Sequence, residues 1–184
     1  MKNAAADRVL ERTRSRLSDW VTLVSRSVQL SHLDSAQTFH SLSQADYISA
    51  LAVLPDGRVP LVRQYRPALE RRTLELPGGL LDGGELPADA IARELREETG
   101  FEAEGEILLT GCLDPDTGRL ENRLWCFFAR MRAQRVPDWS PEPGVEPVVV
   151  GKAEFQRAIL DGEISAQHVA VIGMAVMRGY YRWE

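Results

Sequence analysis

The sequence is poor in cysteine, with only Cys112 and Cys126 among its 184 residues. Two thiols imply no disulfide framework, and their separation along the chain is too great for a CxxC redox pair. Because both lie in apolar stretches, we expect them to be buried as free thiols. Redox chemistry is therefore not suggested by the cysteine content.

Long apolar runs and an excess of positive charge are also missing. No stretch reaches the length that a membrane span needs, and the N-terminal MKNAAADRVLERTRSR has no apolar core of a secretory signal. We therefore expect a cytoplasmic location and no membrane partner. The net charge of -5 argues against general nucleic-acid binding, which needs a basic surface. A small phosphorylated substrate stays compatible with this charge if metal ions and local arginines offset the acidity.

What is present is the composition of a soluble globular protein, with 44% hydrophobic and 27% charged residues. The length allows one domain with a sizeable core and an appendage. We expect a boundary near Gln44, which divides the chain into an N-terminal segment, 1–45, and a main domain, 46–184. In the N-terminal segment, residues 4–17 are expected to form a helix and residues 20–30 a strand, followed by a polar, turn-rich stretch over 31–45.

The main domain alternates apolar runs with turn signals. YISALAVL and VPLVRQYR flank Pro55-Asp56-Gly57-Arg58, which predicts a hairpin. Further strands are expected at 74–76, 104–112, 123–131 and 146–150, and helices at 152–160 and 165–178. In the last helix the core positions are predicted to be Val169, Ile172, Ala175 and Val176. This order of elements predicts an α/β (α+β) fold in which a mixed β-sheet is sandwiched between helices.

The most informative stretch is GGLLDGGELPADAIARELREETGF, which begins at Gly78 and ends at Phe101. Its glycines allow tight turns and close approach of the backbone to a ligand. Pro87 suits the first turn of a helix and Gly100 the position just after its end. The residues between them favour helix. The stretch therefore predicts a glycine-rich loop that leads into a short acidic helix.

Helical geometry places Glu94, Glu97 and Glu98 within an arc of roughly 100° on that helix. Like charges so close destabilise a bare helix, and a hard cation such as Mg²⁺ prefers clustered oxygen ligands. Glu85 adds a carboxylate before the helix, and Arg93 can pair with it and fix the loop against the helix. Taken alone, an ELREE run is more often a solvated helix face with intrahelical ion pairs. The spacing of the whole stretch distinguishes the two interpretations.

From Gly79 through Gly100 that spacing resembles the Nudix box, with Phe101 in place of the usual aliphatic residue. The resemblance implies the Nudix fold and a metal site formed by the Gly79 carbonyl, Glu94, Glu97 and Glu98. It implies magnesium as the cofactor, with manganese as an alternative.

The flanking VRQYRPALERRTLELPGGLLDGGE is similar to ADP-ribose pyrophosphatases and related nucleoside-diphosphate-sugar hydrolases. This branch implies that Arg66 and Glu75 lie near the substrate. It further implies a homodimer in which the N-terminal β-rich segment completes the partner's site, with Trp20 as a stacking candidate. From chemistry, Arg63 and Arg66 suit a clamp on a pyrophosphate, with a surface ion pair as the alternative. Trp20 as a lone aromatic is otherwise more often core.

The expected reaction is hydrolysis of the pyrophosphate of a nucleoside diphosphate sugar, with ADP-ribose giving AMP and ribose 5-phosphate. In the branch it resembles, a loop after the box supplies the general base, which points to Glu146 and Glu142, with Glu146 preferred. Glu97 is an alternative proton acceptor. Two other functions stay open: hydrolysis of a UDP- or GDP-sugar or a dinucleoside polyphosphate, and a non-catalytic nucleotide-sensing module.

Overall fold

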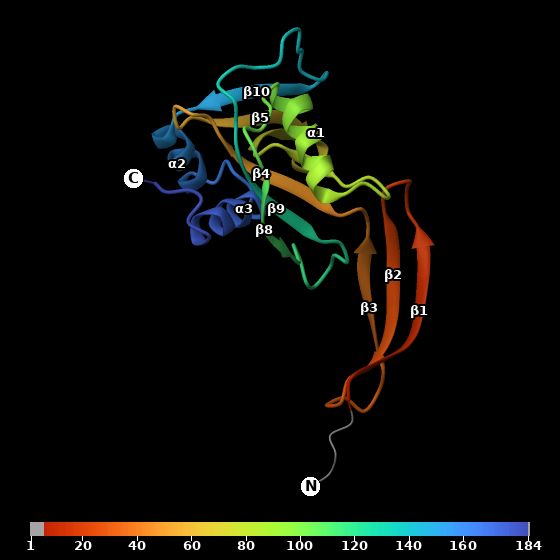
Figure 1. Ribbon diagram of the computed structural model, residues 1–184. Helices are drawn as coiled ribbons and strands as arrows, with labels where there is room; N and C mark the ends of the chain where they lie inside the picture. The colour runs from red at the N-terminus through yellow and green to blue at the C-terminus, as the bar shows by residue number, and fades with distance from the viewer. Residues whose placement is uncertain (1–5, 184) are drawn as a thin grey trace. The chain divides into compact units, whose positions relative to one another are not determined.

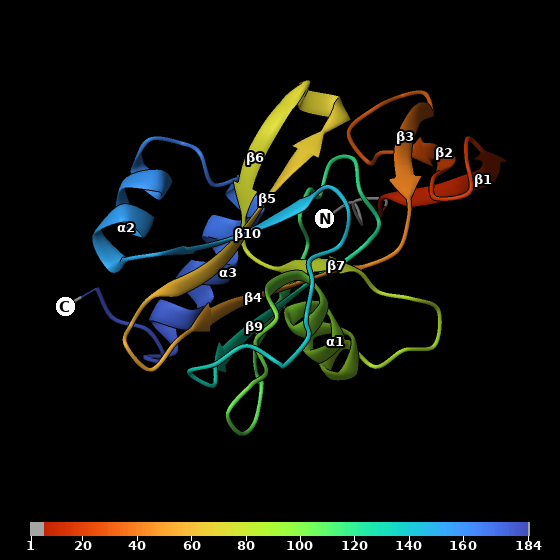
Figure 2. The same cartoon turned by 90° about the horizontal axis from the view of Figure 1, so that it is seen from above.

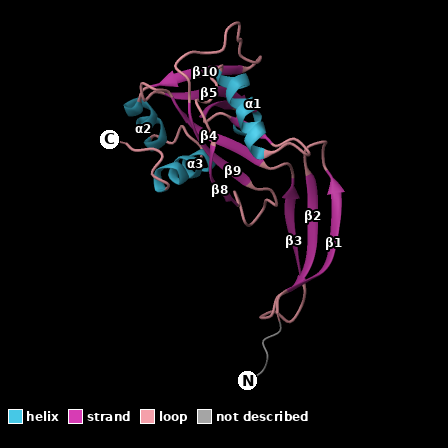
Figure 3. Cartoon of the chain, viewed as in Figure 1, coloured by secondary structure: helices cyan, strands magenta, loops and turns pink. Residues whose placement is uncertain are grey.

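The structure, a computed structural model, describes residues 6–183, and Figures 1 and 3 show their secondary structure. The strands are β1 (Arg8–Arg16), β2 (Thr22–Gln29), β3 (Gln37–Ser43), β4 (Tyr47–Val53), β5 (Val59–Arg66), β6 (Arg71–Glu75), β7 (Gly78–Leu80), β8 (Leu108–Leu113), β9 (Leu124–Arg130) and β10 (Val145–Val150). The helices are α1 (Pro87–Thr99), α2 (Lys152–Leu160) and α3 (Ala166–Met177), with a short 3-10 turn at Pro67–Leu69. In the described part of the chain, no helix is both long and apolar enough to cross a membrane.

The chain divides into two compact units. The first extends to Ala45 and includes the loop Asp114–Arg123, and the second comprises Asp46–Leu113 and Leu124 onwards. The first unit therefore recruits a loop from the middle of the chain. The division into an N-terminal segment for dimer contact, 1–45, and a Nudix hydrolase domain, 46–184, stays a prediction.

The first unit is an antiparallel sheet in the order β1-β2-β3. The helix predicted over residues 4–17 is wrong where the structure describes it, since residues 8–16 form β1; residues 4 and 5 lie outside the described range. All nine residues of β1 are exposed, so the segment has no apolar face that could hold a helix by packing. Pairing with β2 supplies its backbone hydrogen bonds instead. The strand expected over 20–30 is present as β2, and β3 lies in the stretch interpreted as turns.

Glu121, in the loop of this first unit, ties the loop to the sheet. Its carboxylate accepts a hydrogen bond from the Ser41 hydroxyl at 2.6 Å and pairs with the guanidinium groups of Arg26 and Arg14. The Ser41 hydrogen bond lowers the pKa of Glu121, burial opposes this, and the nearby arginines lower it further.

The second unit contains two sheets, in the orders β10-β5-β6 and β7-β4-β9-β8 (Figure 2). β4 and β9 run parallel, while the other pairings are antiparallel. The turn predicted at Asp56-Gly57 is present, with Leu54 N–H donating to the Arg58 carbonyl. The predicted hairpin is nevertheless wrong, because β4 and β5 leave this turn into different sheets.

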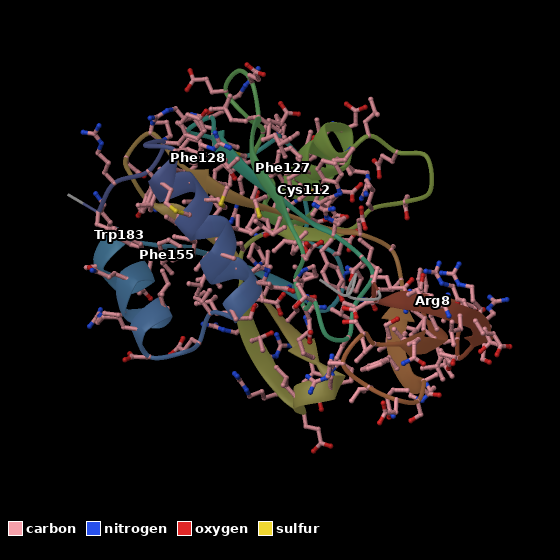
Figure 4. The ribbon with its side chains drawn as sticks, turned by 90° about the horizontal axis from the view of Figure 1, so that it is seen from below. Arg8, Cys112, Phe127, Phe128, Phe155 and Trp183 are labelled. Carbon is pink, nitrogen blue, oxygen red and sulfur yellow. The ribbon has the colours of Figure 1, made fainter. Side chains whose placement is uncertain are left out.

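The sheet that contains β4 and β9 is buried on both faces, and side chains alternate between them. On β9, Phe127 packs in the cluster with α1, and Phe128 packs in the cluster with α2 and α3 (Figure 4). On β4, Ala50 packs in the cluster with α1, and Leu51 packs in the cluster with α2 and α3. The predicted sandwich of a mixed sheet between helices is confirmed.

The C-terminal helices begin and end close to their predicted positions, and the strand expected over 104–112 begins later, at Leu108. In α3, Ile172 and Ala175 are buried as predicted and Val176 is partly buried, but Val169 is 39% exposed. A twelve-residue helix that covers one face of a sheet leaves its opposite side in solvent, and Val169 lies there. Cys126 is buried and Cys112 partly buried, both as free thiols.

Candidate active site

The glycine loop and α1 are held together by backbone geometry. Gly79 pairs with Ile48 of β4, and a Cβ on Gly79 would lie 2.5 Å from Oε1 of Glu94. Any larger residue at position 79 would therefore displace the Glu94 carboxylate from the glycine loop. α1 starts with Pro87 at its first position and ends at Gly100, which has φ +75° and donates its N–H to the Arg96 carbonyl. Both ends of the helix match the sequence signals.

Glu98 is the most deeply buried carboxylate of the box, with 6% of the residue exposed. Its Oε2 accepts the Gly78 N–H at 2.9 Å. Burial raises the pKa of Glu98 to about 8; the hydrogen bond from Gly78 opposes this, and the charges of Glu94 and Glu75 add to it. This side chain is the one that a positive charge in the site would stabilise most.

Glu94 lies beside it and is also largely buried. Its pKa is raised by burial, and further by the negative charges of Glu97 and Glu142, while Arg93 acts in the opposite direction. Glu142 belongs to the loop before β10, so this loop contributes negative charge to the box.

Arg93 connects the loop to the helix. Its guanidinium donates to Glu85 through Nε and Nη2, both at 3.2 Å, which is the ion pair that the sequence suggested. Nη1 also donates to Glu94 at 3.0 Å and to Glu97 at 2.9 Å. Arg93 therefore compensates two of the three clustered carboxylates, whereas within residues 6–183 no arginine hydrogen-bonds to Glu98.

The residues suit a divalent cation in chemistry, although they are not arranged as a finished chelate. Within residues 6–183, no three acidic, histidine or cysteine side chains converge as a ready-made metal site. The buried Glu98 and the partly buried Glu94, both with raised pKa, nevertheless lie against the glycine loop, and oxygen ligands of this kind are those that Mg²⁺ prefers. The donor set at Gly79, Glu94, Glu97 and Glu98 thus fits the predicted group.

A cavity of about 690 Å³ borders the outer side of α1. Glu97 and Glu142 both line it, as do Arg93 and Trp139. This places one of the two candidate bases, Glu142, at the same cavity as a box carboxylate.

The other candidate base, Glu146, is differently placed. It lies on β10 opposite Arg63 of β5 and pairs with Arg63 at 3.1 Å and with Arg72 at 3.6 Å. Arg63 is therefore engaged in an exposed ion pair, which was the alternative to a phosphate clamp. The roles of Glu142 and Glu146 as candidate bases and of Arg63 as a phosphate clamp stay predictions.

Arg66 and Glu75 form a bidentate pair, with Nε–Oε1 at 2.7 Å and Nη2–Oε2 at 2.6 Å. Thr73 donates its hydroxyl to Glu75 at 2.5 Å. Burial disfavours the charged form of Glu75, and the bonds from Arg66 and Thr73 outweigh this, so that its pKa is lowered. The two residues that the resemblance places near a substrate are thus brought together. Both Arg66 and Glu75 also act electrostatically on Glu98.

Comparison with known proteins identifies the family. The model of the NUDIX domain matches residues 45–159, which is more than half of the chain. The chain belongs to the Nudix family. An ADP-ribose pyrophosphatase of Mycobacterium tuberculosis is 35% identical over 134 residues, covering 69% of this chain and 62% of that protein. An ADP-ribose pyrophosphatase of Bacillus subtilis is 45% identical over 56 residues, covering 30% of each chain. The chain thus spans less than two thirds of the length of either relative.

The Nudix fold is also seen in a structural comparison. The crystal structure of an ADP compounds hydrolase superimposes with a TM-score of 0.77, covering 98% of this chain and 96% of that chain. At 19% identity this match concerns the fold alone.

Sequence reasoning missed a contact that holds the end of the Nudix helix. Trp139 donates its indole N–H to the Glu97 carbonyl at 3.0 Å, and its ring lies where a Cβ on Gly100 would be, at 2.5 Å. Arg135 stacks on the rings of Trp139, at 4.9 Å, and Phe101, at 5.2 Å. Phe101 therefore replaces the usual aliphatic residue with an aromatic surface for this loop. A tryptophan in an otherwise polar, Pro-rich loop was the available signal.

We expect Trp139→Phe to lower the free energy of unfolding by about 1 kcal/mol, because it removes one hydrogen bond and keeps an aromatic ring, though a smaller one, at this position. Trp139→Ala removes the ring too and should lower it by about 2–3 kcal/mol. Urea denaturation measures both. Gln134→Ala, an exposed position of the same loop, is the matched control. Equal stability of Trp139→Ala and this control would show that the contact does not hold the helix end.

His168 is a second feature that the sequence did not distinguish from a surface residue. It is 3% exposed, and its Nδ1 lies 3.2 Å from the Ser165 hydroxyl. Burial lowers the pKa of His168 to about 4; the charge of Glu75 opposes this and that of Arg66 adds to it. The imidazole is therefore neutral in the folded protein at neutral pH.

This burial predicts a loss of stability in acid. His168 takes up a proton near pH 6.5 in the unfolded chain and near pH 4 in the folded protein. Its contribution to the free energy of unfolding is therefore complete above pH 6.5 and falls as pH drops between these values. The difference of about 2.5 in pKa corresponds to roughly 3 kcal/mol. Because the raised pKa of Glu98 acts in the opposite direction over the same range, the contribution of His168 is read as a difference: from pH 7 to 4, chemical denaturation should show the free energy of unfolding of the natural protein falling relative to that of His168→Asn, which keeps a polar partner for Ser165. Parallel pH dependence in both proteins would contradict it.

Trp20, the predicted stacking residue, belongs to the first unit. It lies in the turn between β1 and β2, where the Ser18 hydroxyl accepts its backbone N–H at 3.2 Å, and it is 72% exposed. It is therefore not a core residue, which was the alternative interpretation. Stacking on a substrate stays a prediction.

Proposed function

We propose that the protein hydrolyses the pyrophosphate of a nucleoside diphosphate sugar in a reaction that depends on Mg²⁺, with ADP-ribose as the preferred substrate. Water adds and the P–O–P linkage breaks, so that ADP-ribose gives AMP and ribose 5-phosphate. One observation carries this proposal: the buried Glu98 and the partly buried Glu94, both with raised pKa, lie directly on the Gly78–Gly79 loop of a Nudix box. Relatives named ADP-ribose pyrophosphatase support the choice of substrate.

Glu94, Glu97, Glu98 and the Gly79 carbonyl would hold the metal. When bound, a divalent cation supplies charge for the pyrophosphate oxygens and a more acidic water. Arg93 holds Glu94 and Glu97 in place and keeps the loop carrying Glu85 against the helix. Trp139 fixes the backbone at Glu97.

Proton removal from the attacking water falls to the loop before β10. Glu142 is better supported than Glu146, because it lines the cavity with Glu97 and its charge reaches Glu94. Glu146 is held between Arg63 and Arg72. Glu97, whose side chain is 40% exposed, is the alternative acceptor.

Arg66 would offset phosphate charge beside Glu98. Its bidentate partner Glu75 fixes the guanidinium plane. A substrate that draws Arg66 away would leave Glu75 buried and unpaired, so Arg66 is expected to act from its present position.

The test is turnover of a panel of nucleotide sugars with purified protein and Mg²⁺, read by identifying the phosphorylated products. AMP and ribose 5-phosphate from ADP-ribose support the proposal. Turnover of UDP- or GDP-sugars or dinucleoside polyphosphates alone would transfer the assignment to another Nudix substrate. No turnover with Mg²⁺ or Mn²⁺, together with nucleotide binding, would favour the sensing module.

The cytoplasmic location stays a prediction.

We also propose a homodimer formed through the first unit. Val24 is the only fully buried apolar side chain among described residues 6–45, while Val9, Leu10, Trp20 and Phe39 are 46–72% exposed. A small sheet with so little core is marginal by itself, and β1 is an unprotected edge strand. Light scattering should give twice 20.6 kDa, and Leu10→Glu should reduce this to one chain, whereas Leu160→Glu, on exposed α2, should not. A monomeric natural protein would refute the dimer.

A further inference from the structure

We propose that Thr73 is a positioning residue for the hydrolytic reaction: its hydroxyl holds the carboxylate of Glu75 and, through it, the guanidinium of Arg66. The inference rests on the proposed function, because it takes Arg66 to offset the charge of the substrate's phosphates. Thr73 precedes the Nudix box in sequence and belongs to β6, so it extends the site to a strand outside the box.

The register of β5 and β6 brings these side chains to one face of their sheet. Thr73 and Glu75 are two positions apart on β6, and side chains alternate between the faces of a strand. Thr73 pairs with Gln64 of β5, and Arg66 follows Gln64 by two positions, so it lies on the same face. Because Arg66 itself pairs with Arg71, its side chain must extend along the sheet past Thr73 to reach Glu75.

Three hydrogen bonds converge on the Glu75 carboxylate. Arg66 donates from Nε to Oε1 at 2.7 Å and from Nη2 to Oε2 at 2.6 Å, and the Thr73 hydroxyl donates to Oε1 at 2.5 Å. The hydroxyl also lies 3.4 Å from the Gln64 carbonyl, but it has one proton, and the carboxylate is the nearer acceptor. The bond from Thr73 therefore restricts rotation of the carboxylate that sets the plane of the guanidinium.

Burial distinguishes the two ends of this arrangement. Thr73 and Glu75 are each 6% exposed, whereas the Arg66 side chain is 45% exposed. Burial disfavours the charged form of Glu75, and the bonds from Arg66 and Thr73 outweigh this, so that its pKa is lowered. The carboxylate and the hydroxyl thus form a buried support, and the guanidinium is the end that a phosphate can reach.

The support determines what Arg66 can offer to a phosphate. Glu75 engages two of the five N–H donors of the guanidinium, at Nε and Nη2, and three remain beyond this pair. The direction of those three donors follows from the guanidinium plane, since the group is rigid and planar. Arg66 also acts electrostatically on Glu98, which links the support to the Nudix box. Loss of the Thr73 hydroxyl should therefore weaken phosphate binding without removing any charge.

Affinity for α,β-methylene-ADP tests this inference without turnover, because its P–C–P bridge resists hydrolysis. Isothermal titration in the presence of Mg²⁺ gives the Kd. Thr73→Val keeps the shape of the side chain and removes the hydroxyl, and it should raise the Kd about tenfold. Thr73→Ser keeps the hydroxyl and should stay within about twofold of the natural protein. With ADP-ribose, Thr73→Val should raise KM about tenfold and change kcat less than about threefold, because binding shared by the ground and transition states appears in KM.

Thr110→Val is the matched control for a purely structural effect. Thr110 is fully buried in β8, and its hydroxyl donates to the Cys126 carbonyl at 3.0 Å, so this variant also loses a buried hydrogen bond. β8 lies at the opposite edge of its sheet from β7, which carries Gly79. Urea denaturation should show a comparable loss of stability in the two valine variants, whereas only Thr73→Val should lose affinity.

A double-mutant cycle shows whether Thr73 acts through Arg66. Arg66→Lys leaves a positive partner for Glu75 but lacks the planar guanidinium, so Thr73→Val should change the Kd less than about twofold in this background. An equal loss of affinity in both backgrounds would overturn the inference. Natural affinity of Thr73→Val, or the same loss in Thr73→Ser, would also overturn it.

The proposed function is decided separately, by the products formed from ADP-ribose. Binding of the analogue by a natural protein that hydrolyses no nucleotide sugar would refute the hydrolase, and the Kd values of the variants would still decide the role of Thr73. Hydrolysis of ADP-ribose with equal KM and Kd in Thr73→Val and the natural protein would refute the role of Thr73 alone. Failure of the natural protein to bind the analogue would overturn the inference.

Discussion

Glu98→Gln is expected to lower kcat on ADP-ribose by about a thousandfold without unfolding the protein. Glutamine has nearly the same shape, and its amide oxygen can still accept the Gly78 N–H, which lies 2.9 Å from the natural carboxylate. What it removes is the negative charge at the most deeply buried position of the Nudix helix. Steady-state kinetics with Mg²⁺ measures the effect.

Stability separates this prediction from a folding defect. Burial opposes the charged form of Glu98, so a neutral glutamine should leave the midpoint of thermal unfolding unchanged or raise it. Asp89→Asn is the matched control, because Asp89 lies exposed in the first turn of the same helix and should retain full kcat. Near-normal turnover of Glu98→Gln would remove the metal-binding role from this residue.

Glu142→Gln is expected to lower kcat by about a hundredfold or more, with a small change in KM. The reason is that Glu142 shares a cavity with Glu97 and contributes charge at Glu94. Glu146→Gln, at the exposed ion pair with Arg63 and Arg72, should change kcat less than threefold.

The dependence of kcat on pH distinguishes Glu142 from Glu146 in a second, independent way. If Glu142 is the base, the acidic limb of the kcat profile should disappear in Glu142→Gln and persist in Glu146→Gln. The reverse pattern would restore the sequence-based preference for Glu146. If both variants retain the limb and their kcat, the loop does not supply the base, and Glu97 becomes the candidate.

The Nudix helix could be predicted from sequence because its signals are local. Pro87 and Gly100 mark its ends, and a period of 3.6 residues places the carboxylates on one side. Their different environments could not be predicted in this way. Glu98 is buried because the glycine loop, which is distant in sequence, lies against its carboxylate through the Gly78 N–H, whereas the side chain of Glu97 stays 40% exposed.

The helix prediction for the N-terminal segment was wrong because the conformation of this segment is not decided locally. Residues 8–16 contain several helix formers, and local preference alone favours a helix. Their conformation is decided by β2, with which they pair along nearly their whole length. The partners of Glu146 were likewise hidden, since Arg63 is 83 residues away in sequence and adjacent only through the register of β5 and β10.

The turn at Leu54–Arg58 has a consequence for the order of folding. Because it sends β4 and β5 into different sheets, β4 cannot pair with the strand that follows it. Ser49 pairs with Gly78, and Tyr47 pairs with Leu124, which is 124 − 47 = 77 positions later. Such non-local contacts slow folding, since long loops must close before any of the contacts form. During synthesis on the ribosome, β4 can pair with β9, its second neighbour in the sheet, only after residues 124–130 have emerged.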